Sequence, residues 1–312
     1  MKIIVTGGTG FIGGALVKAL RERGDTVVVL TRSVQKAQAA LGPEIEAREW
    51  NPPQPAAWME AFDGADGVVN LAGEPIAASH PTDVVTRRWT DKQKARIMSS
   101  RVDATEAVVE AIKQADPRPP VLVNQSAIGY YGAQGNTPLT ESSPAGQGFE
   151  AQVVVAWEAA ARPVEQLGVR LVLLRTGIVL GASGGALPLM AMPFRMFMGG
   201  TMGEPGQWFS WIHLEDEIGL ILYALAHDNV HGPVNATSPD PVTMEVFSRQ
   251  IGRALGRPSW VPLIGKAMRI GLGEQAEAVL ASLRVLPEAA QSIGYQFHHP
   301  ESAEALRSLL AS

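Results

Sequence analysis

A glycine-rich turn near the start of the chain constrains the fold more than any other feature of the sequence. The run Lys2–Thr6 is short, apolar and rich in β-branched residues, as expected of a buried strand. Glycines follow at positions 7, 10 and 13, and from Phe11 the apolar residues recur at the spacing of one helix face. A strand, a glycine turn and a helix in this order let backbone N–H groups and the helix N-terminus approach a pyrophosphate. We therefore predict a dinucleotide-binding turn, with a tight turn of another α/β protein as the alternative.

The residues of this turn that we expect to contact a dinucleotide are Gly7, Thr9, Gly10, Phe11, Ile12 and Gly13. The next predicted strand, Thr26–Leu30, ends at the polar residues Thr31, Arg32 and Ser33, and no acidic residue follows before Glu44. An acidic side chain at this strand end would bind the ribose 2′-hydroxyl of NAD, whereas a basic one accommodates the 2′-phosphate of NADP. We therefore predict NADP(H) as the cofactor, and the alternative is an arginine that is merely solvated.

The composition excludes several classes of function. The length of 312 residues suggests one large domain or two joined lobes, and a hydrophobic fraction of 46% can supply a sizeable core. The net charge of −5 gives no broad attraction to nucleic acid or to an anionic membrane. The chain has no cysteine, which excludes disulfides and thiol nucleophiles, and no metal site is expected. No apolar stretch approaches the roughly 20 residues that span a bilayer, and the first strand begins at Lys2, so we expect a cytoplasmic protein. We also expect a monomer or homodimer that binds a small molecule.

Predicted strands and helices alternate along the first 240 or so residues. The further strands are Ile45–Arg48, Gly67–Leu71, Val121–Asn124, Val169–Leu174, Gln207–His213 and Pro233–Ala236. The further helices are Trp58–Phe62, Val102–Gln114, Phe149–Gln166, Leu214–Ala226 and one capped by Thr243 that runs to Leu255. The alternation favours an α/β fold, a Rossmann-type doubly wound sheet of about seven mostly parallel strands. We assign residues 1–181 and 209–236 to an NADP-binding domain, and residues 182–208 and 237–312 to a smaller, mainly helical substrate-side lobe with a C-terminal helical tail.

Several segments together resemble one family. The Gly-x-x-Gly-x-x-Gly spacing of Gly7–Gly13 resembles the extended branch of the short-chain dehydrogenase/reductase superfamily. The segments that narrow this resemblance are Leu71–Ile76, Arg88–Thr90, Tyr130–Gly132 and Trp211–His213. They are similar to an atypical epimerase-like family within the NAD-dependent epimerase/dehydratase superfamily, often labelled nucleoside-diphosphate-sugar epimerase or cell-division inhibitor. Near the C-terminus, Val285–Glu288 and Ile293–Phe297 resemble the small domain of unknown function that accompanies this family.

The resemblance implies further cofactor contacts and a candidate reaction centre. The implied contacts are Leu71, Ala72, Gly73, Arg96, Arg101 and Ile178. Ser126 stands where extended relatives place a Ser or Thr that hydrogen-bonds the substrate oxygen, and Tyr130 or Tyr131 is a candidate acid. The alternatives are that Ser126 satisfies loop backbone and that both tyrosines pack beneath the loop. His213, beside Asp216 at a helix start, is expected to make structural hydrogen bonds rather than to take part in catalysis.

The chain lacks the Tyr-x-x-x-Lys pair through which the superfamily exchanges a proton while hydride moves. The residues four positions after its tyrosines are Gln134, Gly135, His227 and His299. Glu158 matches the glutamate that often follows the motif, so the missing pair would stand at Glu150 and Val154. Glu150 or Glu158 could act as a base if burial raised its pKa.

Two functions stay open. One is an NADP(H)-dependent oxidoreductase or epimerase-like enzyme for a small carbonyl or alcohol substrate, such as a nucleotide sugar. The other is a non-catalytic NADP(H)-binding sensor or regulatory protein.

Overall fold

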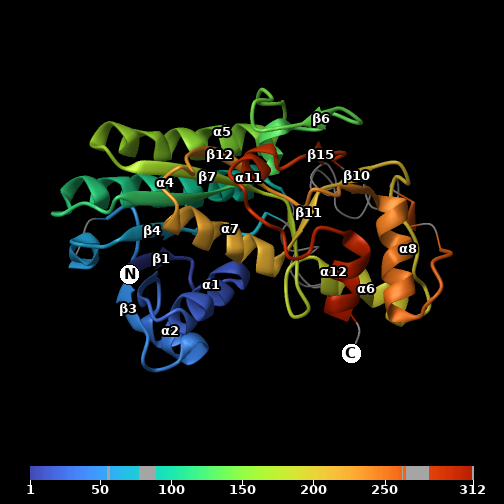
Figure 1. Ribbon diagram of the computed structural model, residues 1–312, viewed down its shortest axis with the longest axis horizontal. Helices are drawn as coiled ribbons and strands as arrows, with labels where there is room; N and C mark the ends of the chain where they lie inside the picture. Colours follow the sequence, from blue (N-terminus) through green and yellow to red (C-terminus); the bar gives the residue numbers. More distant parts are fainter. Residues whose placement is uncertain (55–56, 77–88, 262, 265–280, 311–312) are drawn as a thin grey trace.

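The chain is arranged around one central sheet with helices on both of its faces and a smaller group of helices at one end (Figure 1). The structure is a computed structural model that describes residues 1–54, 57–76, 89–261, 263–264 and 281–310. Parts of two features of the sequence, the Arg88–Thr90 segment and the predicted C-terminal tail, lie outside these described residues. Within them, no helix combines the length and the apolar character that crossing a bilayer requires.

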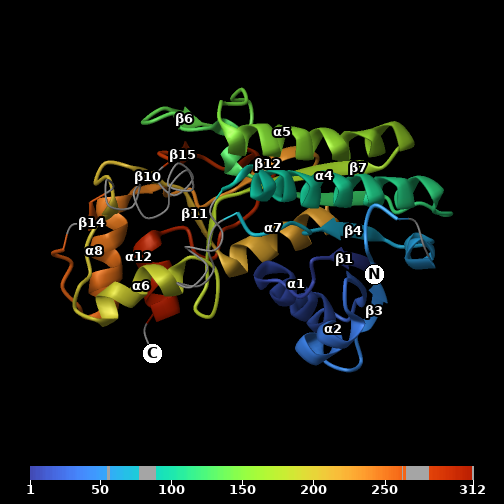
Figure 2. The same cartoon turned by 180° about the vertical axis from the view of Figure 1, so that it is seen from behind.

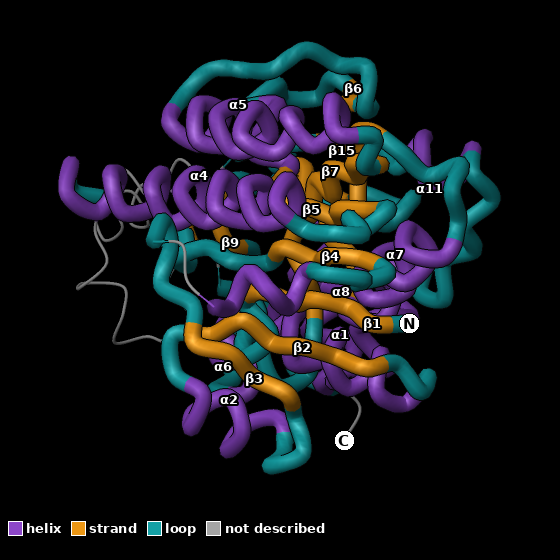
Figure 3. Tube along the Cα trace, turned by 90° about the vertical axis from the view of Figure 1, so that its left-hand side faces the viewer, coloured by secondary structure: helices purple, strands orange, loops and turns teal. Residues whose placement is uncertain are grey.

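The central sheet has seven strands in the order β12-β7-β5-β4-β1-β2-β3, and every pairing in it is parallel. The strands are β1 (Lys2–Thr6), β2 (Thr26–Thr31), β3 (Glu46–Glu49), β4 (Gly67–Asn70), β5 (Val121–Ala127), β7 (Arg170–Thr176) and β12 (Gly232–Ala236). Figure 3 shows them following one another across the molecule from β3 to β7. The doubly wound sheet predicted from the sequence is confirmed. Because β2 and β4 flank β1 on opposite sides, the winding reverses there, and this is where such sheets bind ligands at the carboxyl ends of their strands.

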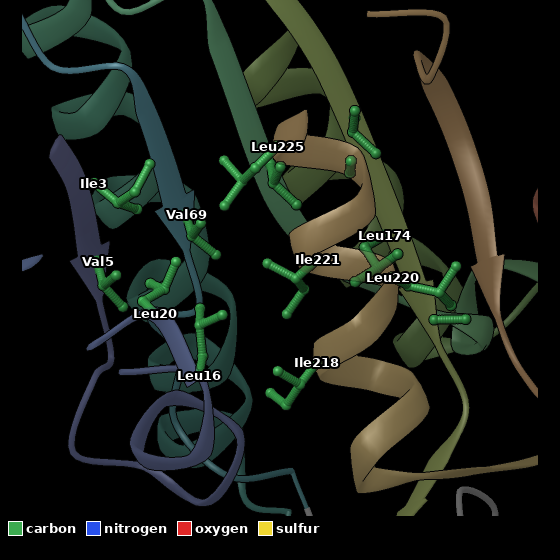
Figure 4. Packing of buried hydrophobic residues seen from close by; sticks show 14 of the residues in the cluster. Ile3, Val5, Leu16, Leu20, Val69, Leu174, Ile218, Leu220, Ile221 and Leu225 are labelled. Atoms are coloured by element: carbon green, nitrogen blue, oxygen red, sulfur yellow. The ribbon is translucent and has the colours of Figure 1, made fainter. Parts of the chain in front are cut away.

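The two faces of the sheet carry different helices (Figure 2). The helices are α1 (Phe11–Glu22), α2 (Val34–Leu41) and α7 (Leu214–Ala226) on one face, and α4 (Asp91–Gln114) and α5 (Phe149–Ala161) on the other. On the first face, Leu16 of α1 and Ile221 of α7 point toward Val5 and Val69 of the sheet (Figure 4). On the second face, the apolar sides of α4 and α5 pack on the sheet and on each other. Both faces are therefore buried, which accounts for the continuous apolar runs of β1, β2 and β4.

Two predicted helices have different ends in the structure. α4 begins at Asp91 rather than Val102, because Thr90 caps it by accepting a hydrogen bond from the backbone N–H of Gln93 at 3.3 Å, and its charged first turns face solvent. α5 ends at Ala161 rather than Gln166, and the chain continues as a 3-10 helix, Arg162–Leu167, whose start contains a proline. Proline has no N–H for the hydrogen bond of an α-helix interior. The predicted short helix near Trp58 is a 3-10 helix, Ala57–Phe62.

The predicted strand Gln207–His213 is wrong as a single strand, because it is two short strands outside the central sheet. β10 (Trp208–Phe209) pairs antiparallel with β13 (Val242–Thr243), and β11 (Trp211–His213) pairs parallel with β8 (Ile178–Leu180). Ser210 separates them, since its side chain accepts a hydrogen bond from the Val285 N–H at 2.9 Å and donates one to the Leu283 carbonyl at 2.7 Å. The remaining short strands are β6 (Pro138–Leu139) with β15 (Arg284–Val285) and β9 (Met202–Gly203) with β14 (Leu263–Ile264).

The helices at the end of the molecule have a hydrophobic core of their own. They are α6 (Leu187–Arg195), α8 (Met244–Leu255) and α12 (Ser302–Leu310), and a short helix, α11 (Glu288–Ser292), packs near β12. Phe194, Phe247 and Leu306 are completely buried in this core, which Trp211 enters from β11. The predicted cap of α8 is confirmed, because Thr243 accepts a hydrogen bond from the N–H of Val246 at 3.4 Å. The boundaries predicted for the two lobes stay a prediction.

Candidate dinucleotide-binding site

The glycine turn folds tightly against the start of α1. Gly7 has φ +67°, in the left-handed region, and its carbonyl accepts a hydrogen bond from the N–H of Gly10 at 2.9 Å. A Cβ atom at Gly13 would lie 2.2 Å from the Gly7 carbonyl oxygen, so only glycine fits there. Thr9 and Gly10, at the tip of the turn, are exposed. The turn thus presents backbone rather than side chains at the carboxyl end of β1.

The N-terminus of α1 is left open by the chain. Gly10 is its N-cap residue, no side chain of the described residues caps the helix, and its first turn has no acidic residue. The first N–H groups of a helix have no partner within the helix and carry a partial positive charge. Since the exposed turn and this helix end lie together at the point where the winding of the sheet reverses, the residues present fit a pyrophosphate.

The end of β2 presents one basic side chain to solvent. The N–H of Ser33 donates to Thr31 Oγ1 at 3.2 Å, and Ser33 in turn caps α2 by accepting from the N–H of Lys36 at 3.4 Å. Arg32, between them, is exposed, and the first turn of α2 has no acidic residue. Thr31 and Ser33 therefore shape the turn, and Arg32 supplies the charge that suits a 2′-phosphate.

The segment after β4 is fixed against the glycine turn by one buried hydroxyl. Thr6 Oγ1 accepts from the N–H groups of Leu71 at 3.1 Å and Ala72 at 3.2 Å, and it donates to Asn70 Oδ1 at 2.7 Å. A Cβ atom at Gly7 would lie 2.7 Å from the Leu71 carbonyl oxygen. The structure therefore brings Leu71 and Ala72 beside the turn, and their contact with a cofactor stays a prediction.

Arg96 and Arg101, both on α4, lie in different surroundings. Arg96 is largely exposed and forms an ion pair with Glu74 at 3.1 Å. Arg101 is buried, with its guanidinium against Gly73 and 5.1 Å from the ring centroid of Trp157. Burial lowers the pKa of Arg101 to about 10, although nearby acidic groups oppose the shift. The two arginines that the resemblance assigns to the cofactor are therefore one surface residue and one interior residue.

Ser126 belongs to a buried hydrogen-bonded network. Its hydroxyl donates to Glu158 Oε1 at 2.7 Å. The same carboxylate accepts two hydrogen bonds from Arg175, at 2.8 and 2.9 Å, and all three residues are buried. Burial, the largest single effect, would lower the pKa of Arg175, but the hydrogen bonds and charge interactions with Glu158 and Tyr131 together outweigh it, and the pKa is raised. Glu158 therefore serves as the counterion of the buried Arg175. Because both of its carboxylate oxygens accept hydrogen bonds from Arg175, it is not suited to act as a base.

The two adjacent tyrosines differ in their access to solvent. Tyr131 is completely buried, donates to Asn235 Oδ1 at 2.7 Å and accepts from Arg175 Nη1 at 3.0 Å. Burial raises the pKa of Tyr131 to about 12. Tyr130 is half-buried, and the Cζ atom of Arg175 lies 3.5 Å from the centroid of its ring. The structure thus joins Ser126 and Tyr131 in one network inside the protein, with Tyr130 at its border.

The loop after β8 covers the side chain of Phe11. A Cβ atom at Gly181 would lie 2.5 Å from the Phe11 ring, and one at Gly184 would lie 2.4 Å from it. Ile178 is on β8, at the start of the same segment, and its side chain is 38% exposed. Ile178 therefore stands at the start of the segment that leads to the Phe11 side chain.

The structural hydrogen bond expected of His213 is confirmed. Its Nδ1 accepts from the N–H of Glu215 at 3.1 Å and caps α7, and burial lowers its pKa to about 4. His213, Glu215 and His299 place possible ligand atoms within 4.8 Å of one another. However, His299 Nε2 already pairs with Glu215 Oε2 at 2.6 Å, and the positive end of the α7 dipole disfavours a cation. We therefore assign the three residues to the helix cap.

One buried acidic residue beneath the carboxyl ends of β5 and β7 was not anticipated. Glu217 on α7 is completely buried, and its Oε1 accepts from Thr176 Oγ1 at 2.8 Å and from Gln125 Nε2 at 3.4 Å. Burial raises its pKa to about 7. A signal was present in the sequence, because Glu217 lies four residues before Ile221 and shares its helix face.

Comparisons with known proteins agree with this geometry. A model of the NAD dependent epimerase/dehydratase family matches residues 3–236, and a model of a domain of unknown function, DUF1731, matches residues 265–309. The chain is 39% identical to the chloroplastic epimerase family protein SDR39U1 homolog of Arabidopsis thaliana, over 99% of this chain and 87% of that protein. It is 40% identical to the epimerase family protein Mb2239 of Mycobacterium bovis, over 97% and 96% of the two chains.

A solved structure is also similar along the whole chain. The crystal structure of the human epimerase family protein SDR39U1, isoform 2, with NADPH superposes with a TM-score of 0.86 at 33% sequence identity and covers 100% of both chains.

Proposed function

This chain belongs to the NAD dependent epimerase/dehydratase family, and we propose that it binds NADP(H) and is an epimerase-like, oxidoreductase-type protein that acts on a small substrate. The observation that carries the proposal is the open glycine turn, with its uncapped helix N-terminus and with Arg32 where an NAD-binding protein would have an acidic residue. The NADPH held by the human protein supports the choice of NADP(H).

Each part of the cofactor has candidate residues in the described structure. The backbone N–H groups from Thr9 to Gly13 would hold the pyrophosphate, and Arg32 would hold the 2′-phosphate. The segment Leu71–Gly73 would run along the cofactor, and Ile178 would face its nicotinamide side. When bound, NADP(H) donates or accepts a hydride, and the chain has to position the substrate and exchange a proton with it.

Of the three residues proposed for catalysis, Tyr130 is the best placed to touch a substrate. Ser126 and Tyr131 are buried, and their hydroxyl protons are donated to Glu158 and Asn235. Tyr130 is half-buried beside the Arg175 guanidinium, which would favour a negative charge on a nearby oxygen. The proposed substrate is a small carbonyl or alcohol compound such as a nucleotide sugar, and the state of assembly, monomer or homodimer, stays a prediction.

A non-catalytic sensor of NADP(H) is the second candidate. The absence of Tyr-x-x-x-Lys favours it, together with the engagement of Ser126 and Tyr131 in the interior. The two candidates are separated by following NADPH consumption with a panel of carbonyl compounds and nucleotide sugars. Steady turnover that Tyr130→Phe abolishes supports the enzyme, whereas tight NADPH binding with no turnover supports the sensor.

The choice of NADP(H) is tested by calorimetric titration of Arg32→Ala with NADPH and NADH. Losing a charged hydrogen bond to the 2′-phosphate should weaken NADPH binding by about 10- to 100-fold and leave NADH binding unchanged. Lys18→Ala, which removes one exposed positive charge from α1, is the control for net charge. If Arg32→Ala binds both cofactors as the wild type does, Arg32 does not select NADP(H).

A further inference from the structure

Large apolar side chains are exposed together at the end of the molecule where α6 and α8 lie (Figure 1). Among the described residues, eight large apolar side chains are exposed, and five of them stand in α6 or shortly after α6 and α8. These five, which we call the apolar tip, are Met192, Met196, Phe197, Met198 and Trp260, with exposed fractions between 43% and 69%. Apolar side chains scattered singly over a surface are normal, whereas a group of them marks a surface that binds something.

The backbone holds the apolar tip in place. Phe197 has φ +61°, in the left-handed region that residues other than glycine rarely adopt. Its N–H donates to the Phe194 carbonyl at 2.9 Å, and the Gly199 carbonyl accepts from the N–H groups of Trp260 and Val261, both at 3.0 Å. These bonds join the segment after α6 to the segment after α8. An exposed phenylalanine is thus kept in a strained conformation, and strain of this kind clusters at functional sites.

The surroundings of the apolar tip are basic. Residues 192–203 and 250–261 contain three arginines and no acidic residue, although the net charge of the whole chain is −5. All three are exposed, and none has an ion-pair partner in the part of the chain that the structure describes; they are Arg195, Arg253 and Arg257. The Cζ atom of Arg257 lies 4.3 Å from the centroid of the Phe197 ring. Positive charge therefore stands directly beside the exposed apolar groups.

This charge restricts what the apolar tip can bind. Two copies of the chain that met through the same surface would bring the arginines of one copy against those of the other, and like charges repel. The bound surface is therefore anionic and also accepts apolar groups. Because each of the five side chains is exposed by 43% or more, they project outward, and a lipid surface accepts projecting side chains without a matching groove.

We propose that the apolar tip and its three arginines bind the protein to the surface of an anionic membrane. Aromatic side chains favour the boundary between lipid headgroups and acyl chains, and methionine adapts to irregular apolar surroundings. The arginines pair with lipid phosphates. Such binding lies on the membrane and needs no helix that crosses it. Since the rest of the chain is acidic, this end of the molecule would face the membrane. The inference goes beyond the proposed function and does not depend on it.

Co-sedimentation of the full chain with lipid vesicles tests this inference. Vesicles of equal parts of phosphatidylcholine and phosphatidylserine are compared with vesicles of phosphatidylcholine alone. We expect the wild type to sediment with the anionic vesicles only, and added salt to release it. Trp260→Ser should weaken the binding by at least about tenfold, because it removes a large inserted side chain. Arg257→Gln should weaken it by about fivefold, the contribution of one cation near an anionic membrane.

Phe197→Asn is the sharpest variant, because asparagine tolerates the left-handed conformation and the substitution removes the ring without straining the backbone. It should keep the thermal unfolding temperature of the wild type and weaken vesicle binding by at least about tenfold. Val155→Ser, which removes an exposed apolar side chain from α5, is the matched control and should bind as the wild type does.

Three results would overturn the inference. The first is a wild-type protein that does not sediment with the anionic vesicles. The second is vesicle binding by Phe197→Asn and Trp260→Ser that equals that of the wild type. The third is a wild-type dimer, seen by light scattering, that Phe197→Asn separates into monomers, because a second copy of the chain would then cover the apolar tip.

Discussion

Gly13 and Gly14 are neighbours in α1, yet a methyl group would meet different surroundings at the two positions. At Gly13 a Cβ atom would lie 2.2 Å from the backbone oxygen of Gly7, whereas at Gly14 the nearest atom is 3.9 Å away. Gly13→Ala should therefore lower the free energy of unfolding by about 1–3 kcal/mol through overpacking and abolish NADPH binding. Gly14→Ala should be neutral or stabilising, by up to about 1 kcal/mol, because alanine favours helix.

Urea unfolding and calorimetric titration of the two glycine variants measure both effects. Equal stability and equal NADPH binding in Gly13→Ala and Gly14→Ala would show that the turn does not need its close approach to α1.

The buried carboxyl group of Glu217 makes stability depend on pH. Its pKa is raised to about 7 in the folded protein, from its ordinary value of 4.5. Between these values the folded state keeps a proton that the unfolded state has lost, so stability falls as the pH rises through this window. The Glu217→Gln variant has no carboxyl group at this position, so its stability does not fall in this way. The free energy of unfolding of the variant, relative to wild type, should therefore increase from about pH 5 to about pH 8, by roughly 3 kcal/mol at most.

Urea unfolding of Glu217→Gln and wild type at several pH values checks this dependence, with the exposed substitution Glu22→Gln as the control. A difference between Glu217→Gln and wild type that stays constant with pH would mean that Glu217 is ionised in the folded protein.

At the scale of residues, the sequence predicts backbone requirements better than the environment of polar side chains. Gly7 and Gly13 could be predicted because the geometry of a glycine turn follows from local spacing. The network of Ser126 could not, because its partners Glu158 and Arg175 are distant in sequence, at 32 and 49 residues along the chain. Only the folded sheet shows that the Ser126 hydroxyl is directed to a buried carboxylate.

Among the elements, the N-terminus of α7 holds the chain that precedes α12. The carboxylate of Asp216 accepts hydrogen bonds from the N–H groups of His298 at 2.7 Å and His299 at 2.9 Å, and from the hydroxyl of Tyr295 at 3.2 Å. In Asp216→Asn an amide group would face these donors and could accept fewer of them. Since hydrogen bonds to charged groups contribute about 1.5–3 kcal/mol each, the variant should release the segment 295–299.

Hydrogen exchange of the backbone amides of residues 295–299 measures this release. We expect faster exchange there in Asp216→Asn and no change in β1. Asp228→Asn, at the exposed C-terminal side of α7, is the matched control. Unchanged protection of His298 and His299 in Asp216→Asn would contradict this role of Asp216.

The elements themselves were predictable where one physical signal dominated. β1, β2 and β4 are apolar, β-branched runs and were found with nearly correct ends. The start of α4 was missed because the charged residues after Asp91 hide a helix whose first turns are solvated, although Thr90 is a good N-cap. The split of Gln207–His213 depends on the distant residues Leu283 and Val285, and nothing local signals it.

At the scale of the whole molecule, the doubly wound, parallel sheet followed from the alternation of strands and helices, because parallel strands are joined by right-handed crossovers, usually helical. The arrangement of the helices at the end of the molecule did not follow from the sequence. Its core joins α6, α8 and α12, which are spread over more than a hundred residues of the chain. The position of the candidate site depends on both parts, since the loop after β8 reaches back to Phe11.

Calorimetric titration of the wild-type protein with NADPH, and separately with NADH, tests the central claim most directly. We predict one NADPH bound per chain, with NADH bound at least about tenfold more weakly, because only NADPH carries the 2′-phosphate that Arg32 would meet. Binding of neither cofactor would contradict the account of the glycine turn, and tighter binding of NADH would contradict the role of Arg32.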